Sequence, residues 1–350
     1  MENIEESDDK FFAHRKLASV QIIKNLKPVE KSKDEIGSIL GWKVVVPANK
    51  YKEGEKVIFF EIDSWLPAGK KWTSKMKPKN LIVKTTNKHG EIIQGLVMKL
   101  QILSKIENCK LNLEELNEGY DLTEILEVKK FDENSEEGKK EKEKGFPTQF
   151  IEKSDEIRLQ SNLHYLEMFA GKEFYSSIKY DGTSATYLIN PENGNFKICS
   201  RNFSVEENDD NFYSEIAKKY DIKNKLIKTG GLYAIQGEIY GPKINKNPLE
   251  VNERKIAVFN IKNIKNNYYL GMDELIKVCK ELELPMVEIV EEGIFNYKTV
   301  DELVQKSKGL YPGTQHPREG LVYRLKEHWN EGHKRCSFKV INDDYLIDSK

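Results

Sequence analysis

Apolar and polar positions alternate in short runs over residues 10–125, and glycine and proline separate the runs. β-Branched residues recur at every second position or in short apolar stretches. The segments with this pattern are Leu17–Ile23, Gly41–Val46, Lys56–Asp63, Leu81–Lys84 and Gly95–Leu100. Five short strands at this spacing are typical of a small barrel of the OB type. We therefore expect an N-terminal OB-like domain over residues 1–127.

The pattern stops near Val128, where the segment KKFDENSEEGKKEKEKG begins. This segment is nearly all charged, which is typical of a solvated linker or exposed loop. The sequence therefore predicts a linker over residues 128–149 and a second domain over residues 150–350.

The sequence of the second domain contains both strand-like and helical patterns. The residue patterns predict strands over Glu173–Tyr180, Thr183–Ile189, Leu232–Tyr240, Lys255–Lys262, Gly320–Lys326 and Cys336–Val340. Helical periodicity covers Ser161–Phe169, Asp210–Ile227, Met272–Leu284 and Val300–Leu310. We expect an α+β domain built on antiparallel sheets.

Composition narrows the class of protein. The chain has 56 basic and 57 acidic side chains. This balance excludes a strongly basic, histone-like protein and an acidic disordered tail. It has no stretch of 18 apolar residues, no GxxxxGK[ST] loop and no GxGxxG motif. The N-terminus is acidic, unlike a secretory signal, and the four cysteines are scattered, as in proteins with reduced thiols. We expect an intracellular protein, cytoplasmic or nuclear, with no membrane span.

The most informative segment is Ile178–Thr183. Lys179 follows an apolar strand, and Asp181 and Gly182 then allow a tight turn, which places an amine at the rim of a pocket. A surface hairpin with an Asp-Gly turn is the alternative for this segment taken alone.

Further motifs follow in order along the chain. They are Ser200-Arg201-Asn202, Gln236-Gly237-Glu238, Val258-Phe259-Asn260-Ile261, Arg318-Glu319-Gly320-Leu321-Val322 and Ser337-Phe338-Lys339-Val340. Together with Lys179-Tyr180-Asp181-Gly182, this ordered set resembles the nucleotidyltransferase motifs of the covalent ligase superfamily, which includes DNA ligases, RNA ligases and mRNA-capping enzymes.

The N-terminal half sharpens the resemblance. Gly41–Val46, Phe60–Pro67 and Gln94-Gly95-Leu96 look like the N-terminal module of RNA ligase family 5, and Lys144–Pro147 with Asp155–Asn162 resembles its domain junction. Only eleven residues follow Lys339, too few for the C-terminal OB domain of DNA ligases and capping enzymes. The resemblance covers essentially the whole chain and implies an ATP-dependent RNA ligase.

The resemblance implies a reaction that joins 3′-OH and 5′-phosphate RNA ends through lysyl-AMP and RNA-adenylate intermediates. Lys179 would be the nucleophile, and we expect burial and a nearby cation to lower the pKa of its amine. The implied ATP-binding residues are Arg158, Lys179, Gly182, Arg201, Glu238, Phe259, Glu319 and Lys339. Arg158 would reach the outer phosphates, Arg201 the sugar or the RNA end, and Phe259 would stack on adenine unless it is simply a core residue.

The reaction also implies a divalent cation, Mg²⁺ or Mn²⁺. Asp181, Glu238 and Glu319 are the acids that the motifs bring around the pocket, and carboxylates suit such ions. Of seven arginines, Arg158, Arg201 and Arg318 fall in the nucleotide motifs. One departure is Ser337, where related RNA ligases often have lysine; Lys334 or Arg335 would compensate.

The expected N-terminal barrel supports a separate hypothesis. Lys70, Lys71, Trp72 and Lys75, with Lys77 and Lys79, form a lysine-rich patch around an aromatic ring, compatible with RNA binding. A solvated charged loop is the alternative. We expect a monomer whose partner is RNA, most simply a nicked duplex. The alternatives for the whole chain are an mRNA-capping-type guanylyltransferase and a non-catalytic RNA-binding OB protein.

Overall fold

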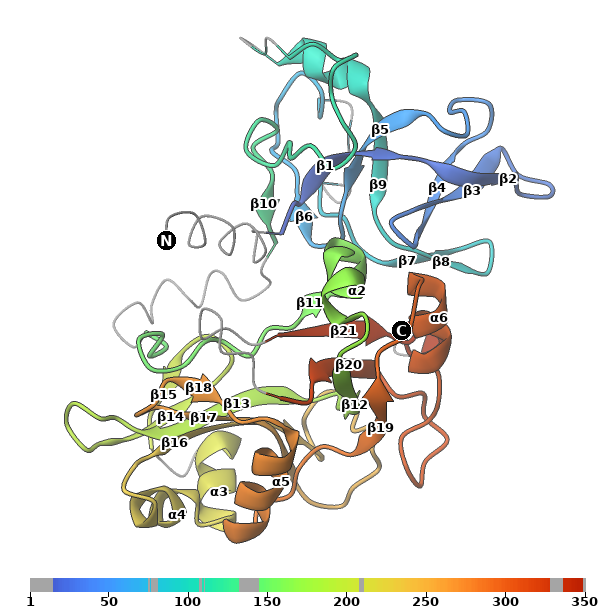
Figure 1. Ribbon diagram of the computed structural model, residues 1–350. Coiled ribbons are helices and arrows are strands. Elements are labelled where there is room, and N and C mark those ends of the chain that lie inside the picture. Colours follow the sequence, from blue (N-terminus) through green and yellow to red (C-terminus); the bar gives the residue numbers. More distant parts are fainter. Residues whose placement is uncertain are drawn as a thin grey trace. The chain divides into compact units, whose positions relative to one another are not determined.

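The computed structural model describes residues 15–74, 76, 81–106, 109, 111–131, 145–207, 211–327 and 336–348. The chain divides into two compact units (Figure 1), each described here by itself. One unit draws on residues 12–135 with 160–163, and the other chiefly on residues 136–159 with 164–350. The predicted boundaries at 127 and 149 stay predictions, because most of the charged segment between them lies outside the described residues.

The N-terminal unit is built from short antiparallel strands. They are β1 (Ala18–Ile22), β2 (Lys24–Pro28), β3 (Asp34–Ile39), β4 (Trp42–Pro47), β5 (Lys56–Phe60), β6 (Ser64–Trp65), β7 (Thr86–Lys88), β8 (Glu91–Ile93), β9 (Leu96–Lys99) and β10 (Lys129–Lys130), with a 3-10 helix, η2, over Leu100–Lys105. The strands pair in the orders β1-β5-β9, β2-β3-β4, β10-β6 and β7-β8.

Side-chain alternation explains these strands. In β4, Trp42, Val44 and Val46 are buried while Lys43 and Pro47 are exposed, which is the period of a strand with one covered face. The predicted OB fold is confirmed. The predicted strand over Leu81–Lys84 is wrong, because this segment forms only a single β-bridge from Ile82 to Trp65.

The second unit combines two sheets with helices. Its strands are β11 (Ile157–Arg158), β12 (Glu173–Lys179), β13 (Thr183–Ile189), β14 (Phe196–Cys199), β15 (Ser204–Val205), β16 (Tyr233–Tyr240), β17 (Lys255–Asn263), β18 (Tyr268–Tyr269), β19 (Ile289–Ile294), β20 (Gly320–Leu325) and β21 (Ser337–Ile341). Its helices are η3 (Leu159–Ser161), α2 (His164–Phe169), α3 (Phe212–Lys219), α4 (Ile222–Lys228), α5 (Met272–Glu281), α6 (Val300–Ser307) and α7 (Asp343–Asp348).

The two sheets have the orders β11-β21-β20-β12-β19 and β15-β14-β13-β16-β17-β18. All their pairings are antiparallel except β11 with β21. The expected α+β fold with antiparallel sheets is confirmed.

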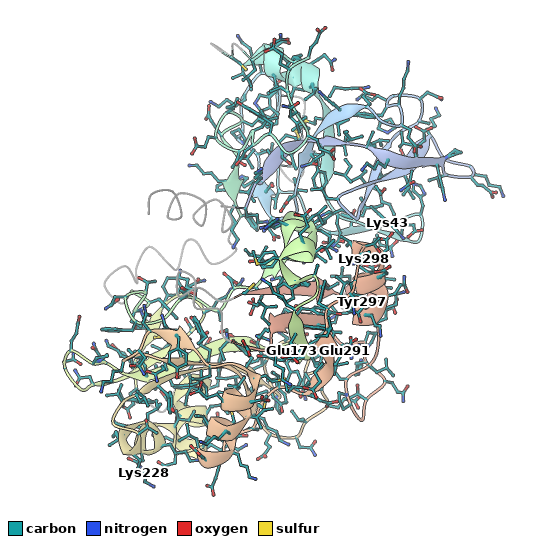
Figure 2. The ribbon with its side chains drawn as sticks, in the orientation of Figure 1. Lys43, Glu173, Lys228, Glu291, Tyr297 and Lys298 are labelled. Atoms are coloured by element: carbon teal, nitrogen blue, oxygen red, sulfur yellow. The ribbon has the colours of Figure 1, made fainter. Side chains whose placement is uncertain are left out.

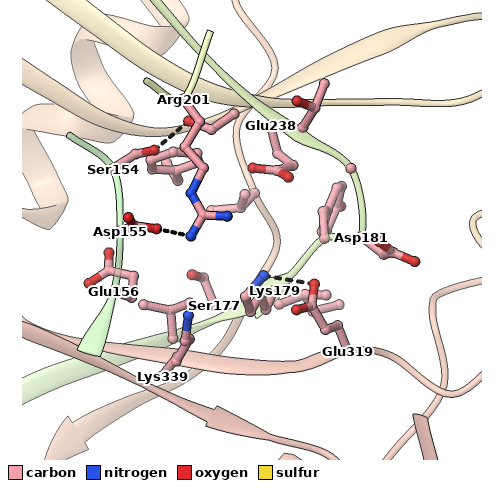
Figure 3. A pocket seen from close by; sticks show the side chains of 18 of the residues that line it. Ser154, Asp155, Glu156, Ser177, Lys179, Asp181, Arg201, Glu238, Glu319 and Lys339 are labelled. Carbon is pink, nitrogen blue, oxygen red and sulfur yellow. Dashed lines mark hydrogen bonds and ion pairs between the residues drawn. The ribbon is translucent and has the colours of Figure 1, made fainter. Parts of the chain in front are cut away.

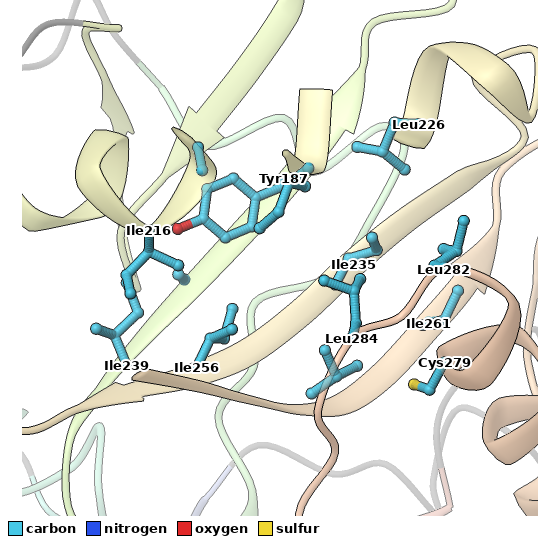
Figure 4. Packing of buried hydrophobic residues seen from close by; sticks show 14 of the residues in the cluster. Tyr187, Ile216, Leu226, Ile235, Ile239, Ile256, Ile261, Cys279, Leu282 and Leu284 are labelled. Atoms are coloured by element: carbon cyan, nitrogen blue, oxygen red, sulfur yellow. The ribbon is translucent and has the colours of Figure 1, made fainter. Parts of the chain in front are cut away.

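Apolar side chains of α3, α4 and α5 pack on the six-stranded sheet (Figure 4). Ile216, Leu226 and Cys279 meet Tyr187, Ile235 and Ile261 in one buried cluster. The predicted helix over Asp210–Ile227 is two helices, because Asp221 has φ 50°, a left-handed conformation that ends α3 and starts α4. The five-stranded sheet carries a separate aromatic layer in which Phe169, Phe295 and Phe338 pack edge to face.

Lysines lie mostly at the surface. Figure 2 shows Lys228 at the outer edge of the second unit, and Lys43, Lys228 and Lys298 are all exposed. Within the described part of the chain, no helix is both long and apolar enough to cross a membrane.

Candidate active site

A cleft of about 280 Å³ opens where the two sheets of the second unit meet. The chain passes from β12 in one sheet to β13 in the other through Tyr180-Asp181-Gly182, so the cleft receives side chains from both sheets (Figure 3). Its lining is mainly polar and comprises Ser154, Asp155, Glu156, Ser177, Ile178, Lys179, Tyr180, Asp181, Gly182, Thr183, Ser184, Arg201, Glu238, Phe259, Val287, Glu319, Val322, Arg324 and Lys339.

Lys179 is the last residue of β12 and stands opposite Gly320, the first residue of β20. This register brings the Lys179 amine to the carboxylate just before β20, and Nζ donates a hydrogen bond to Glu319 Oε2 at 2.7 Å (Figure 3). The Tyr311 hydroxyl donates to the Lys179 carbonyl at 3.1 Å and accepts from the Glu319 amide at 3.1 Å. Tyr311 is 1% exposed, so it is a fixed brace between the two residues.

Gly182 allows the turn after Lys179 to approach β16. A Cβ atom at this position would lie 2.2 Å from the Ile239 carbonyl oxygen and 2.9 Å from Glu238 Cγ. Any larger residue would push the Lys179 turn away from the strand that carries Glu238. The glycine is therefore a requirement of the site's geometry.

Three predicted acids, Asp181, Glu238 and Glu319, line the same cleft. Burial raises the pKa of Glu238 to about 8; the carboxylates of Glu319 and Asp181 act in the same direction, and Lys179 and Arg201 act against it. Burial and Glu319 also raise the pKa of Asp181 above its ordinary value. The cleft thus concentrates negative charge that a bound cation would relieve. Among the described residues, no group of three or more His, Cys, Asp or Glu side chains is arranged to hold a metal ion.

The predicted lowering of the Lys179 pKa is wrong for the protein alone. Burial favours the neutral amine, but the charges of Glu319 and Glu238 and the hydrogen bond to Glu319 together raise the pKa of Lys179 above its ordinary value. The nearest partners of the amine are acids rather than cations, and a negative field stabilises the ammonium form.

The predicted cations come from both sheets, as the acids do. Lys339 is in β21, opposite Arg158 of the parallel strand β11. Burial, then the charges of Lys179 and Arg158, lowers the pKa of Lys339 to about 7. Arg201 lines the cleft and is paired with Asp155, whereas Arg158 is adjacent to Lys339 and is not part of the lining.

Phe259 reaches the cleft because β17 has a bulge. Gln236 pairs with Asn260 and Gly237 pairs with Val258, so Phe259 is the extra residue between them. Its neighbours Val258 and Asn260 are buried, whereas Phe259 is half-buried and lines the cleft with its ring 6.0 Å from the Arg324 guanidinium. This placement favours a role in the cleft over one in the core.

Several residues of the site were not predicted. Glu156 accepts from Ser337 Oγ at 2.5 Å and pairs with Arg324 at 3.3 Å, and Tyr311 braces Lys179. The run Asp155-Glu156-Ile157-Arg158 was visible in the sequence, but nothing local linked it to Arg324. Lys334 and Arg335, predicted to compensate for Ser337, lie outside the described residues.

Arg318 does not belong to the nucleotide site. Its guanidinium donates to the carbonyls of Lys306, Ser307 and Lys308, so it caps the end of α6. The sequence places Arg318 in a nucleotide motif, but in the structure its guanidinium binds the carbonyl groups at the C-terminal end of α6.

The predicted lysine-rich patch belongs to the N-terminal unit, whereas the residues of the cleft belong to the second unit. Trp72 is half-buried and its ring stacks on Phe60 at 5.8 Å. Lys70 pairs with Glu127 at 2.5 Å and Lys71 is exposed, while Lys75 lies outside the described residues. One face of the Trp72 ring is therefore covered by the protein itself.

Comparison with known proteins agrees with this geometry. Residues 172–341 match the model of the RNA ligase family, and residues 17–100 match an OB-fold domain. No curated protein sequence matches the chain.

Solved structures of Naegleria gruberi RNA ligase are similar over nearly the whole chain. A structure with PPi has 25% identity and a TM-score of 0.77, covering 96% of this chain and 99% of that one. Mutant structures with AMP and Mn and with ATP and Mn have 25% identity and TM-scores of 0.79 and 0.78, covering 95% of this chain and 99% of those. By its matched domains and their order, the chain carries an OB-fold domain followed by a domain of the RNA ligase family.

Proposed function

We propose that this protein is an ATP-dependent RNA ligase that joins 3′-OH and 5′-phosphate ends through lysyl-AMP and RNA-adenylate intermediates. The observation that carries the proposal is the Lys179 amine, held 2.7 Å from Glu319 in a cleft that Asp181, Glu238 and Lys339 also line. An RNA ligase family domain with this arrangement supports covalent nucleotidyl transfer.

In the first step, the neutral Lys179 amine attacks the α-phosphorus of ATP. An N–P bond forms, the P–O bond to the β-phosphate breaks, pyrophosphate leaves and the amine loses a proton to solvent. AMP then passes to an RNA 5′-phosphate, which frees Lys179, and attack by a 3′-OH forms the phosphodiester and releases AMP. Lys339 and Arg158 would hold phosphate oxygens, Arg201 would contact the sugar or RNA end, and Phe259 would stack on adenine.

The donor set fits a divalent cation. Asp181 and Glu238 add hard oxygen ligands beside Glu319, and Mg²⁺ commonly takes one or two carboxylates with waters and substrate phosphates. When bound, the ion would supply positive charge to phosphate oxygens, and it would also offset the carboxylate field that raises the Lys179 pKa. Naegleria RNA ligase structures titled with ATP and Mn support this assignment.

Adenylylation tests the proposal directly. The protein incubated with α-labelled ATP and Mg²⁺ or Mn²⁺ should keep the label after denaturation, and Lys179→Ala should lose it. Lys228→Ala, an exposed lysine on α4, is the matched control and should label normally. Absence of label on the parent protein, or label on Lys179→Ala, would contradict the proposed mechanism. Preference for labelled GTP would instead indicate a guanylyltransferase.

The RNA substrate is a second question. Sealing of a nicked RNA duplex, a nicked RNA–DNA hybrid and single strands, each with 3′-OH and 5′-phosphate ends, identifies the preferred break. We propose a monomer that acts on nicked duplexes inside the cell, in the cytoplasm or nucleus. All four cysteines are free thiols, which supports an intracellular site.

A further inference from the structure

An exposed tryptophan marks one face of the N-terminal unit. Trp65 lies in β6 between two buried neighbours, Ser64 and Leu66, which are both 0% exposed, while Trp65 is 48% exposed. Period-two alternation therefore turns the indole outward. An exposed aromatic ring does not contribute the free energy that its burial would provide. An exposed tryptophan is therefore a frequent sign of a binding surface.

Strand β10 and the bridged segment around Ile82 extend this surface beside β6 (Figure 1). Trp65 pairs with Lys129 of β10 on one side and with Ile82 on the other. Residues opposite one another in antiparallel strands share a face, and so do residues two positions further along. Phe131 and Lys84 therefore join the same side. We call these five residues, Trp65, Ile82, Lys84, Lys129 and Phe131, the Trp65 face.

Ring contacts hold the face in place. Trp65 and Phe131 meet edge to face, with centroids 6.4 Å apart and planes at 84°, and Lys84 Nζ lies 5.4 Å from the centre of the Phe131 ring. The Phe131 amide donates to the Asp63 carbonyl at 2.6 Å, which ties β10 to the residue just before β6. The aromatic pair is thus positioned by backbone bonds and needs little ordering before it binds.

Lysines lie on and beside the face. Among the described residues, Lys84 and Lys129 belong to the face and are exposed, and the exposed Lys130 follows on the other side of β10. Two described acids that are close to the face in the chain have cations of their own: Asp63 lies 3.5 Å from Arg15, and Glu127 lies 2.5 Å from Lys70. Aromatic rings flanked by lysines suit a polyanion that carries flat bases.

We propose that the Trp65 face binds unpaired nucleotides of the RNA substrate, with one base stacked on Trp65 and adjacent phosphates contacted by Lys84 and Lys129. The bases of an RNA duplex are already stacked on each other, so only an unpaired nucleotide offers a free face. The identification of the polyanion as RNA rests on the proposed function. The surface differs from the lysine-rich patch around Trp72, whose ring is partly covered by Phe60.

RNA-binding measurements on the full chain test the proposal. Fluorescence anisotropy gives Kd for a labelled single-stranded 12-nucleotide RNA and for a nicked duplex without unpaired nucleotides. Stacking contributes about 1–3 kcal/mol per base, so Trp65→Ala should weaken single-strand binding about 5- to 150-fold, and Trp65→Phe should keep most of the affinity. The nicked duplex should bind Trp65→Ala and the parent alike.

The lysines have a separate readout. Two lost phosphate contacts should reduce the slope of log K against log salt by about 1.4 for single strands, and Lys84→Ala/Lys129→Ala carries this test. Matched controls are Tyr120→Ala, another exposed aromatic of this unit, and Lys31→Ala/Lys105→Ala. Both should bind like the parent. Melting temperatures of all variants confirm that each is folded.

The outcomes separate this proposal from the ligase proposal. Equal single-strand affinity of parent, Trp65→Ala and Tyr120→Ala overturns the Trp65 face, as does an equal loss on the nicked duplex. Labelling of the parent by ATP is measured on the same preparation. A parent that labels but binds RNA independently of Trp65 refutes only the Trp65 face. A parent that binds RNA through Trp65 without labelling refutes only the ligase proposal.

Discussion

Arg324 and Ser337 stand directly opposite each other on β20 and β21, and both bond to the carboxylate of Glu156. Arg324 also donates to Ser177 Oγ at 2.9 Å. Related RNA ligases often have lysine at the Ser337 position, and here the neighbouring strand supplies the cation on the same face of the sheet. Arg324 therefore supplies, from the neighbouring strand, the positive charge that a lysine at position 337 would bring, and this charge is paired with Glu156.

Removal of one partner from this buried pair should be costly. The side chains of Arg324 and Glu156 are 8% and 9% exposed, so Arg324→Met leaves a buried carboxylate without its cation. We expect a loss of about 3–5 kcal/mol in the free energy of unfolding, measured by denaturant titration. Arg201→Met breaks the exposed pair with Asp155 and should cost less than about 1 kcal/mol. Equal costs for the two variants would contradict this reading of the pair.

Tyr311→Phe tests the brace on the nucleophile. The variant removes the hydroxyl that joins the Lys179 carbonyl to the Glu319 amide and leaves the ring in place. Two lost hydrogen bonds of about 1 kcal/mol each should slow lysyl-AMP formation at least about 10-fold in single-turnover labelling. The control is Tyr297→Phe, whose hydroxyl bonds to Glu291 at 2.7 Å outside the cleft (Figure 2), and it should label at the parent rate. Parent-like labelling by Tyr311→Phe would show that the brace is dispensable.

Gly182→Ala should move the nucleophile. The added Cβ would lie 2.2 Å from the Ile239 carbonyl, and the backbone has to shift to relieve that overlap. A displacement on the order of 1 Å should reduce the labelling rate about 100-fold. Gly145→Ala is the matched control, because its Cβ would have nothing within 4 Å. Unchanged labelling by Gly182→Ala would mean that the turn tolerates displacement.

Glu238 should make stability depend on pH. Its pKa in the folded protein is about 8, above the ordinary 4.5, so the folded state retains a proton that the unfolded chain releases between these values. Its contribution to stability is fully present below about pH 4.5 and is lost as pH rises through 8. Glu238→Gln removes this dependence, so it should melt higher than the parent at pH 8 and by a smaller margin at pH 5, without metal or ATP.

The comparison needs a matched control. Lys339, with its pKa lowered to about 7, acts in the opposite direction, but it is present in both proteins and largely cancels in their difference. Glu173→Gln, an exposed acid at the start of β12, should give the same melting difference at both pH values. A Glu238→Gln margin that does not grow from pH 5 to pH 8 would contradict the assigned pKa.

Local patterns in the sequence determined much of this protein. Short apolar runs rich in β-branched and aromatic residues predict β12, β16, β17 and β20, and these strands are buried over most of their length. The family resemblance carried by the motifs along those strands implied one pocket for Lys179, Glu238, Glu319 and Lys339, and all four line one cleft.

Only the tertiary structure decided which groups face one another. The bulge in β17 turns Phe259 into the cleft, and cross-strand register sets Glu319 beside Lys179 and Arg324 beside Ser337. These neighbours come from residues far apart in the sequence, so no local pattern could reveal that acids would raise the Lys179 pKa. The same holds for the tryptophans: packing covers one face of Trp72 and leaves Trp65 exposed, because burial depends on the strands alongside.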